Sequence, residues 1–106
     1  MRRVLVAEPD SDLSVLLERQ IERLGYQPVR DTPDGPPPDV DAVVLEPASA
    51  VGHSLLRRFG DAVPPVVCFS IYPREAGLEP PGSVAYLVKP ASFAKLGATL
   101  QLLFAA

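Results

Sequence analysis

Short apolar segments alternate with amphipathic stretches along the chain. Apolar runs at residues 4–7, 40–45 (interrupted by Asp41), 66–69 and 84–88 predict strands that are buried on both faces. A further segment at 26–30 predicts a short strand, and Pro28 favours an edge position for it because proline cannot donate a ladder hydrogen bond. The pattern therefore predicts a sheet with one strand that is less buried than the others.

Apolar residues at helical spacing predict three helices, at residues 13–24, 48–59 and 92–104. Ser11 and Asp12 are expected to cap the first helix, and Gly25 and Gly60 stand where the first two end. The residues expected on the apolar faces are, in chain order, Leu13, Leu16, Leu17, Ile21, Leu24, Val51, Leu55, Leu56, Phe59, Phe93, Leu96, Leu100 and Leu103.

Two segments break this alternation. Residues 31–39 hold four prolines and one glycine, which predicts a loop without a helix. Residues 71–83 hold three prolines and two glycines, which leaves room for one helical turn at most.

Buried strands that alternate with amphipathic helices are typical of a parallel sheet covered on both faces. Right-handed crossovers then give an α/β, doubly wound, five-stranded sheet of flavodoxin-like strand order, 2-1-3-4-5. A chain of 106 residues with 47% apolar residues suits one domain, 1–106, and its start at Met1 favours a protein that works alone.

Charge and cysteine content narrow the function classes. Thirteen acidic against ten basic residues give a net charge of −3, which argues against nucleic acid as a partner. The single Cys68 cannot form an internal disulfide, and its place within a strand predicts a buried, unreactive thiol. The apolar runs are too short for a membrane span or a signal peptide, so we expect a cytoplasmic protein without a membrane partner.

Polar residues follow the predicted strands at the edge where parallel sheets bind ligands: Glu8, Asp10, Glu46, Ser70 and Lys89. Converging carboxylates suit a hard cation such as Mg²⁺, and a lysine beside a hydroxyl suits a phosphoryl oxyanion. The alternative is structural, with Lys89 neutralising Glu8 and Glu46 in an ion pair. The residues alone leave both interpretations open.

Four segments in this order resemble the receiver domains of two-component response regulators, the CheY-like family. They are VLVAEPDSDLSVLLERQIERLGY, DAVVLEP, PPVVCFS and VAYLVKPASFAKL, and together they span essentially the whole chain. The resemblance implies that Glu8 and Pro9 hold the places of the family's acidic pair and Glu46 that of the phosphorylated aspartate. It further implies that Ser70 and Lys89 contact the phosphoryl group and that Lys89-Pro90 is a cis peptide. Tyr86 falls at the family's switch aromatic, and a merely packed strand aromatic is the alternative.

The chain departs from the family pattern at the reacting positions. Glu46 is one methylene longer than aspartate, and Pro9 offers no carboxylate to a metal. Asp10 is a weak substitute ligand, because it lies one residue further along the chain. We therefore expect no aspartyl phosphorylation and no cofactor beyond weakly bound Mg²⁺.

The segments 31–39 and 71–83 replace the family's second helix and reduce its fourth. We expect this loss to expose an apolar patch that a homodimer buries. His53 is expected to be an ordinary surface histidine.

The function expected from these features is that of an atypical receiver, or pseudo-receiver. It would act in bacterial signalling as a non-enzymatic protein–protein interaction module that binds a histidine kinase or a downstream effector. One alternative is a working Mg²⁺-dependent phospho-acceptor. Another is a small metal-dependent hydrolase or nuclease built from Glu8, Asp10 and Glu46.

Overall fold

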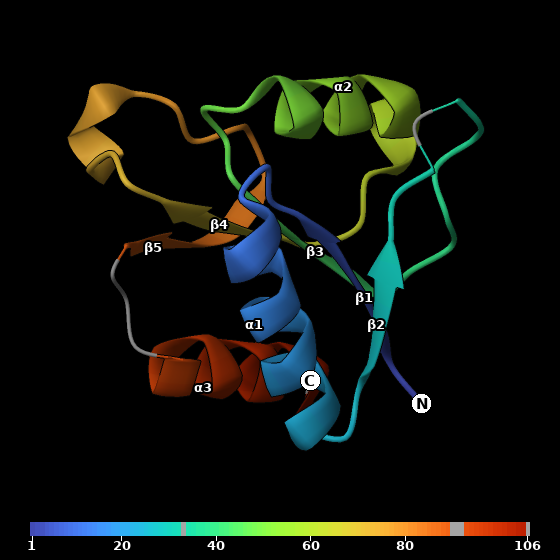
Figure 1. Ribbon diagram of the computed structural model, residues 1–106. Helices are drawn as coiled ribbons and strands as arrows, with labels where there is room; N and C mark the ends of the chain where they lie inside the picture. The colour runs from blue at the N-terminus through green and yellow to red at the C-terminus, as the bar shows by residue number, and fades with distance from the viewer. Residues whose placement is uncertain (33, 90–92, 106) are drawn as a thin grey trace.

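A single parallel sheet organises the molecule (Figure 1). The computed structural model describes residues 1–32, 34–89 and 93–105, apart from the side chain of Phe93. Its strands are β1 (Arg3–Ala7), β2 (Gln27–Arg30), β3 (Ala42–Leu45), β4 (Val66–Ser70) and β5 (Ser83–Val88). Their order in the sheet is β2-β1-β3-β4-β5, and each neighbouring pair is parallel. The predicted doubly wound, flavodoxin-like order is confirmed.

Three α-helices cover the two faces of the sheet. Figure 1 shows α2 (Ala50–Phe59) on one face, with α1 (Ser11–Arg23) and α3 (Phe93–Ala105) on the other. The three predicted helices are thus confirmed. Within the described ranges, no helix is both long enough and apolar enough to cross a membrane.

The alternation of side chains along each strand divides the core into two layers. Val4 and Val6 of β1 face α1 and α3, where they meet Leu17 and Ile21. Leu5, the residue between them, faces α2. A parallel strand that feeds both layers must be apolar at every position, which explains the uninterrupted apolar runs of the sequence.

The start of α1 differs from the prediction. Asp10 is the N-cap, because its Oδ1 atom accepts hydrogen bonds from the N–H groups of Asp12, at 3.0 Å, and Leu13, at 3.1 Å. Ser11 and Asp12, which the sequence favoured as caps, lie inside the first turn. Asp10 precedes two further residues that can cap a helix, so residue type alone does not place the cap.

Two of the residues predicted on apolar helix faces are largely exposed. The exposed fraction is 46% for Leu16 and 41% for Val51. Leu16 lies beside the buried Leu17 in sequence, and only one of two adjacent helical residues can point directly at the sheet. The placement of the Phe93 side chain lies outside the described part of the chain.

The loop that follows β2 is fastened to α2. Arg58 donates to the carbonyl oxygens of Thr32, at 3.0 Å, and Gly35, at 3.2 Å, and forms an ion pair with Asp31. Among the described residues of 31–39 there is no helix, as predicted. One long side chain therefore holds a proline-rich loop where a helix was expected in the family.

The segment before β5 forms one short turn, η2 (Arg74–Ala76), again as predicted. Four apolar residues in or beside this region remain exposed: Ile71, Tyr72, Val84 and Val88. This short turn thus leaves apolar side chains in solvent on β5 and in the segment that leads to it.

Candidate functional site

The polar residues singled out from the sequence lie at the carboxyl ends of four strands. Glu8 follows β1, Glu46 follows β3, Ser70 ends β4 and Lys89 follows β5. The parallel register aligns these ends, since Ala7 pairs with Leu45 and Ser70 with Val88. We call Glu8, Glu46, Ser70 and Lys89 the carboxyl-end corner.

Lys89 is the centre of this corner. Its ammonium donates to Glu8 Oε1 and to Glu46 Oε2, the latter at 3.0 Å. The side chains of Lys89, Glu8 and Glu46 are only 14%, 3% and 7% exposed. The structural ion pair that the sequence left open is therefore present, with two carboxylates sharing one cation.

The second oxygen of Glu46 is also engaged. Its Oε1 atom accepts from the N–H of Ala48 at 3.1 Å. Its backbone carbonyl accepts from Ser49 Oγ at 2.8 Å, and the same hydroxyl caps α2 by accepting from Gly52 N–H at 3.0 Å. The carboxylate of Glu46 is thereby fixed in direction as well as in charge.

Gly52 permits this close approach of α2 to the strand end. A Cβ atom at this position would lie 2.6 Å from the carbonyl oxygen of Glu46, a distance that requires a shift of backbone. Ser49 and Gly52 were not among the predicted site residues. The signal that could have found Gly52 is a glycine inside a helical pattern, which often marks a close contact.

The protonation of the corner follows from its contacts. Burial raises the pKa of Glu46, but the Ser70 hydroxyl, the Ala48 N–H and the Lys89 ammonium together bring it below the ordinary value. Burial lowers the pKa of Lys89, but the hydrogen bonds and charges of Glu8 and Glu46 bring it above its ordinary value. Both groups are therefore charged at neutral pH.

Ser70 is completely buried beside this network. Its Oγ accepts from the N–H of Tyr72 at 3.1 Å, and its carbonyl accepts from the backbone N–H of Lys89 at 2.6 Å. Tyr86 packs against the layer under α2, and its hydroxyl donates to the Tyr72 carbonyl at 2.8 Å. The hydroxyl of Tyr86 is thus tied to the segment after β4, which is compatible with either predicted role of this residue.

The donors at this corner do not fit a magnesium site. Pro9 has no side-chain oxygen, Asp10 is exposed with one oxygen committed to capping α1, and Glu8 is bound to Lys89. No group of three His, Cys, Asp or Glu side chains within residues 1–32, 34–89 and 93–105 is placed to hold a metal ion. A shallow cavity of about 340 Å³ opens here, with Glu8, Pro9, Asp10, Glu46 and Lys89 among its lining residues.

The remaining single residues are placed as follows. Cys68 is buried, and burial, followed by the negative charge of Glu79, raises the pKa of its thiol to about 11. His53 is exposed on α2. Pro90, and with it the predicted cis peptide after Lys89, lies outside the described residues.

Comparisons with known proteins give matches of structure only. No protein-family model and no curated protein match the chain. A response regulator receiver protein from Burkholderia phymatum is 21% identical, with a TM-score of 0.79 over 99% of this chain and 96% of that one. The receiver domain of Francisella response regulator 1452 is 21% identical, with a TM-score of 0.78 over 98% and 97%.

A third solved structure is the Thermotoga maritima response regulator TrrA in complex with Mg²⁺ and BeF. It is 19% identical, with a TM-score of 0.73 over 97% of this chain and 99% of that one. These similarities extend over nearly the full length of each partner in the comparison. The chain has the fold of response-regulator receiver domains.

Proposed function

We propose that this chain is a pseudo-receiver, a receiver-like interaction module that works without aspartyl phosphorylation. The observation that supports this most directly is the ion-pair network of Lys89 with Glu8 and Glu46. An incoming phosphoryl oxyanion would have to compete for Lys89 with both carboxylates. Here two buried carboxylates already neutralise this lysine.

The geometry of Glu46 supports the same proposal. Its carboxylate points toward Lys89 and the Ala48 N–H, and both of its oxygens accept hydrogen bonds. A nucleophilic carboxylate must instead present a free oxygen in line with the donor phosphate. The substitution at Pro9 removes a second requirement, because no carboxylate there can ligate Mg²⁺.

In this proposal Glu46 is a fixed charge. A phosphoryl group would bring about −1.5 to −2 charges, whereas a carboxylate brings one, so the mimicry of a phosphorylated receiver is partial. The module is held in one state and exerts its effect by binding a histidine kinase or a downstream effector in the bacterial cytoplasm. It acts as a single domain, 1–106, and catalyses no reaction of its own.

The test is the intact mass of the folded chain after incubation with acetyl phosphate and Mg²⁺, beside a metal-free control. We expect no gain for the natural chain. We expect the double variant P9D/E46D, which restores both missing carboxylates, to gain one phosphoryl group. The single variant E46D is the matched control, since it restores the nucleophile without the metal ligand.

A metal-dependent gain on the natural chain would contradict the proposal and favour the working phospho-acceptor. A hydrolase would reveal itself by metal-dependent release of phosphate without any gain in protein mass. If the double variant also stays unmodified, the substitutions at Glu46 and Pro9 do not by themselves explain the absence of phosphorylation.

The exposed apolar residues support a homodimer as part of this proposal. Ile71 and Val84 are 62% and 51% exposed in and beside the segment that lost its helix. Burial of such side chains favours association by about 25 cal/mol per Å². Sedimentation equilibrium should show a dimer, and a monomer at high concentration would contradict this part.

A further inference from the structure

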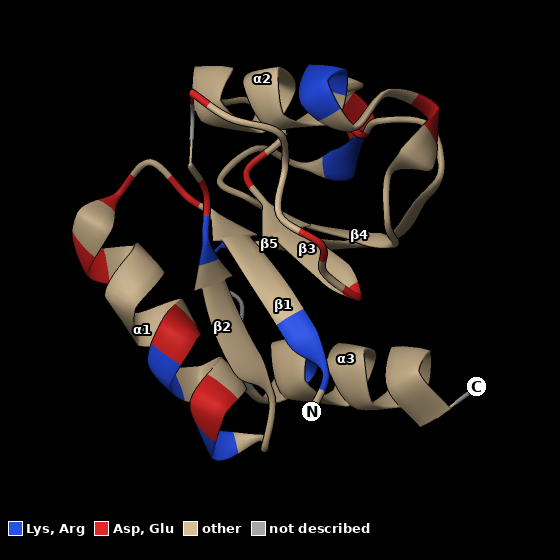
Figure 2. Ribbon diagram, turned by 90° about the vertical axis from the view of Figure 1, so that its right-hand side faces the viewer, with Lys and Arg blue, Asp and Glu red and all other residues tan. Residues whose placement is uncertain are grey.

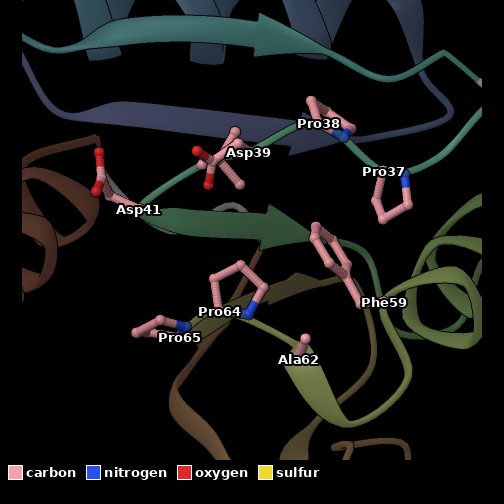
Figure 3. Close-up of a pocket in the computed structure, with 9 residues that line it drawn as sticks. Pro37, Pro38, Asp39, Asp41, Phe59, Ala62, Pro64 and Pro65 are labelled. Carbon is pink, nitrogen blue, oxygen red and sulfur yellow. The ribbon is translucent and has the colours of Figure 1, made fainter.

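A hollow of about 550 Å³ lies at the amino ends of β3 and β4, at the opposite end of the sheet from the carboxyl-end corner (Figure 3). Its walls come from segments that are distant in sequence. In Figure 3, Pro37, Pro38 and Asp39 lie on one side of β3, and Phe59, Ala62, Pro64 and Pro65 lie on the other. We call this the amino-end hollow.

Prolines restrict the backbone that lines the hollow. Four of its lining residues are prolines, whose rings fix the backbone φ angle and present apolar CH₂ groups. Phe59 adds an aromatic face from the end of α2. A surface of this kind loses little conformational entropy when a ligand binds, which favours recognition.

The loop wall of the hollow is fastened at both of its ends. Arg58 holds Thr32 and Gly35 from the side of α2. The guanidinium of Arg3, in β1, donates to the backbone carbonyl of Asp39. These contacts at both ends hold the proline-rich loop in place as one wall of the hollow.

The charge of the hollow is defined by one carboxylate. Asp41 is matched, since its Oδ2 atom accepts from the Arg3 N–H at 2.8 Å and its Oδ1 atom lies 3.8 Å from Arg2. The exposed carboxylate of Asp39 makes no ion pair or hydrogen bond with any residue in the described part of the chain. Asp61, next to the lining residue Ala62, is exposed in the same way. The Arg3 guanidinium, bound to the Asp39 backbone carbonyl, offsets part of this charge, and the exposed carboxylates of Asp39 and Asp61 are the groups that a cationic ligand can pair with.

We propose that the amino-end hollow docks a segment of a partner protein that carries an arginine or lysine beside an apolar side chain. The aliphatic stem of such a residue packs on the prolines, and its cationic head reaches Asp39. The face of Phe59 adds a cation–π attraction. The proposal deepens the pseudo-receiver role, on which it rests, by assigning a docking surface that is independent of Glu46.

The experiment is an amide-resolved NMR titration of the full chain with N-acetyl-leucyl-arginine amide. The shifts are expected at the amides of Val40, Asp41, Phe59 and Ala62, which line the hollow. N-acetyl-leucyl-glutamate amide, which reverses the charge, is the control probe and should leave these amides unchanged. Equal shifts with both probes, or shifts that avoid these amides, would overturn the proposal.

Three variants sharpen the titration. Asp39→Asn should weaken binding of the arginine probe by about two- to fivefold, the range of an exposed ion pair. Asp34→Asn, an exposed carboxylate of the same loop outside the lining of the hollow, is the matched control and should not. Ala62→Arg, at an exposed position, fills the hollow with a cation and should abolish the shifts.

Other outcomes separate this proposal from the proposed function. Shifts of the same amides that depend on protein concentration without any probe would show that a second copy occupies the hollow, and would overturn a partner segment. Phosphorylation of Glu46 would overturn the pseudo-receiver while leaving the titration unaffected. Loss of probe binding in the natural chain would overturn only the docking surface.

Discussion

The two ends of the sheet differ in how their charged side chains are placed. At the carboxyl end, Glu8, Glu46 and Lys89 are nearly buried and satisfy one another. At the amino end, Asp39 is exposed beside a hollow of prolines. The charged side chains pair with one another at one end, and at the other end a carboxylate lies exposed beside a hollow.

The contrast places an ion-pair network at one end of the sheet and a loop-walled hollow at the other. Glu8, Glu46 and Lys89 pair with one another where the strands end. The proline-rich loop forms one wall of the hollow, and Arg58 holds it to α2. Figure 2 shows a different arrangement of charge on α1, where acidic and basic residues lie next to each other along the helix.

The largest effect is expected from removing the Lys89 ammonium at the carboxyl-end corner. Lys89→Met leaves two buried carboxylates without their partner, which should lower the free energy of unfolding by about 3–5 kcal/mol. Urea unfolding at pH 7 measures this. Arg57→Met, which removes an exposed cation from α2, is the matched control and should change stability by less than about 0.5 kcal/mol.

A second variant tests whether the cost of Lys89→Met comes from the two carboxylates that it leaves without a partner. The triple variant K89M/E8Q/E46Q removes all three charges and should recover at least half of the lost stability, because no buried charge remains uncompensated. A cost for Lys89→Met of less than about 1 kcal/mol would show that water reaches the corner freely.

The pH dependence of stability tests the same network with a smaller effect. Glu46→Gln should cost about 2 kcal/mol at pH 7, the range of a hydrogen bond to a charged group. Because the folded pKa of Glu46 is lowered, the advantage of the natural chain should shrink as pH falls below 4.5. Because the folded pKa of Lys89 is raised, the natural chain should remain more stable than Glu46→Gln up to pH 10.5. This difference in the free energy of unfolding should disappear at higher pH.

Unfolding of both proteins at several pH values measures this difference directly. Glu22→Gln, at an exposed position of α1, serves as the control and should give a flat difference near zero. A constant difference between the natural chain and Glu46→Gln across the acid range would mean that the charge of Glu46 adds nothing to stability.

The smallest expected effect concerns the amino end of the sheet. Arg58→Met should cost about 1–2 kcal/mol, since Arg58 Nε and Asp31 Oδ1 are buried without hydrogen-bond partners in the described part of the chain and the pair is only partly satisfied. Its specific signature is faster hydrogen exchange at Gly35, with weaker binding of the arginine probe. Unchanged hydrogen exchange at Gly35 would show that the loop keeps its conformation without Arg58.

Much of the fold follows from patterns that are local in sequence. Apolar runs place the strands, and the prolines of 31–39 forbid a helix there whatever surrounds them. The strand-end polar residues are predictable too, because the parallel topology brings the ends together. Glu8, Glu46, Ser70 and Lys89 meet as that topology requires.

The remaining features depend on contacts between distant residues. Nothing near Arg58 in sequence indicates that its side chain reaches Thr32, 26 residues earlier. The amino-end hollow joins prolines from two loops, which no single window of sequence contains. The choice between a metal site and an ion pair at Lys89 likewise needed the positions of the side chains.

The position of Pro28 in β2 has a consequence for growth of the sheet by strand addition. The N–H of Gln27 donates toward β1, so the nitrogen of the next residue, Pro28, faces the free edge and has no hydrogen to offer. The other edge strand, β5, contains no proline. The loss of this donor makes the β2 edge less receptive than the β5 edge to a strand from another molecule.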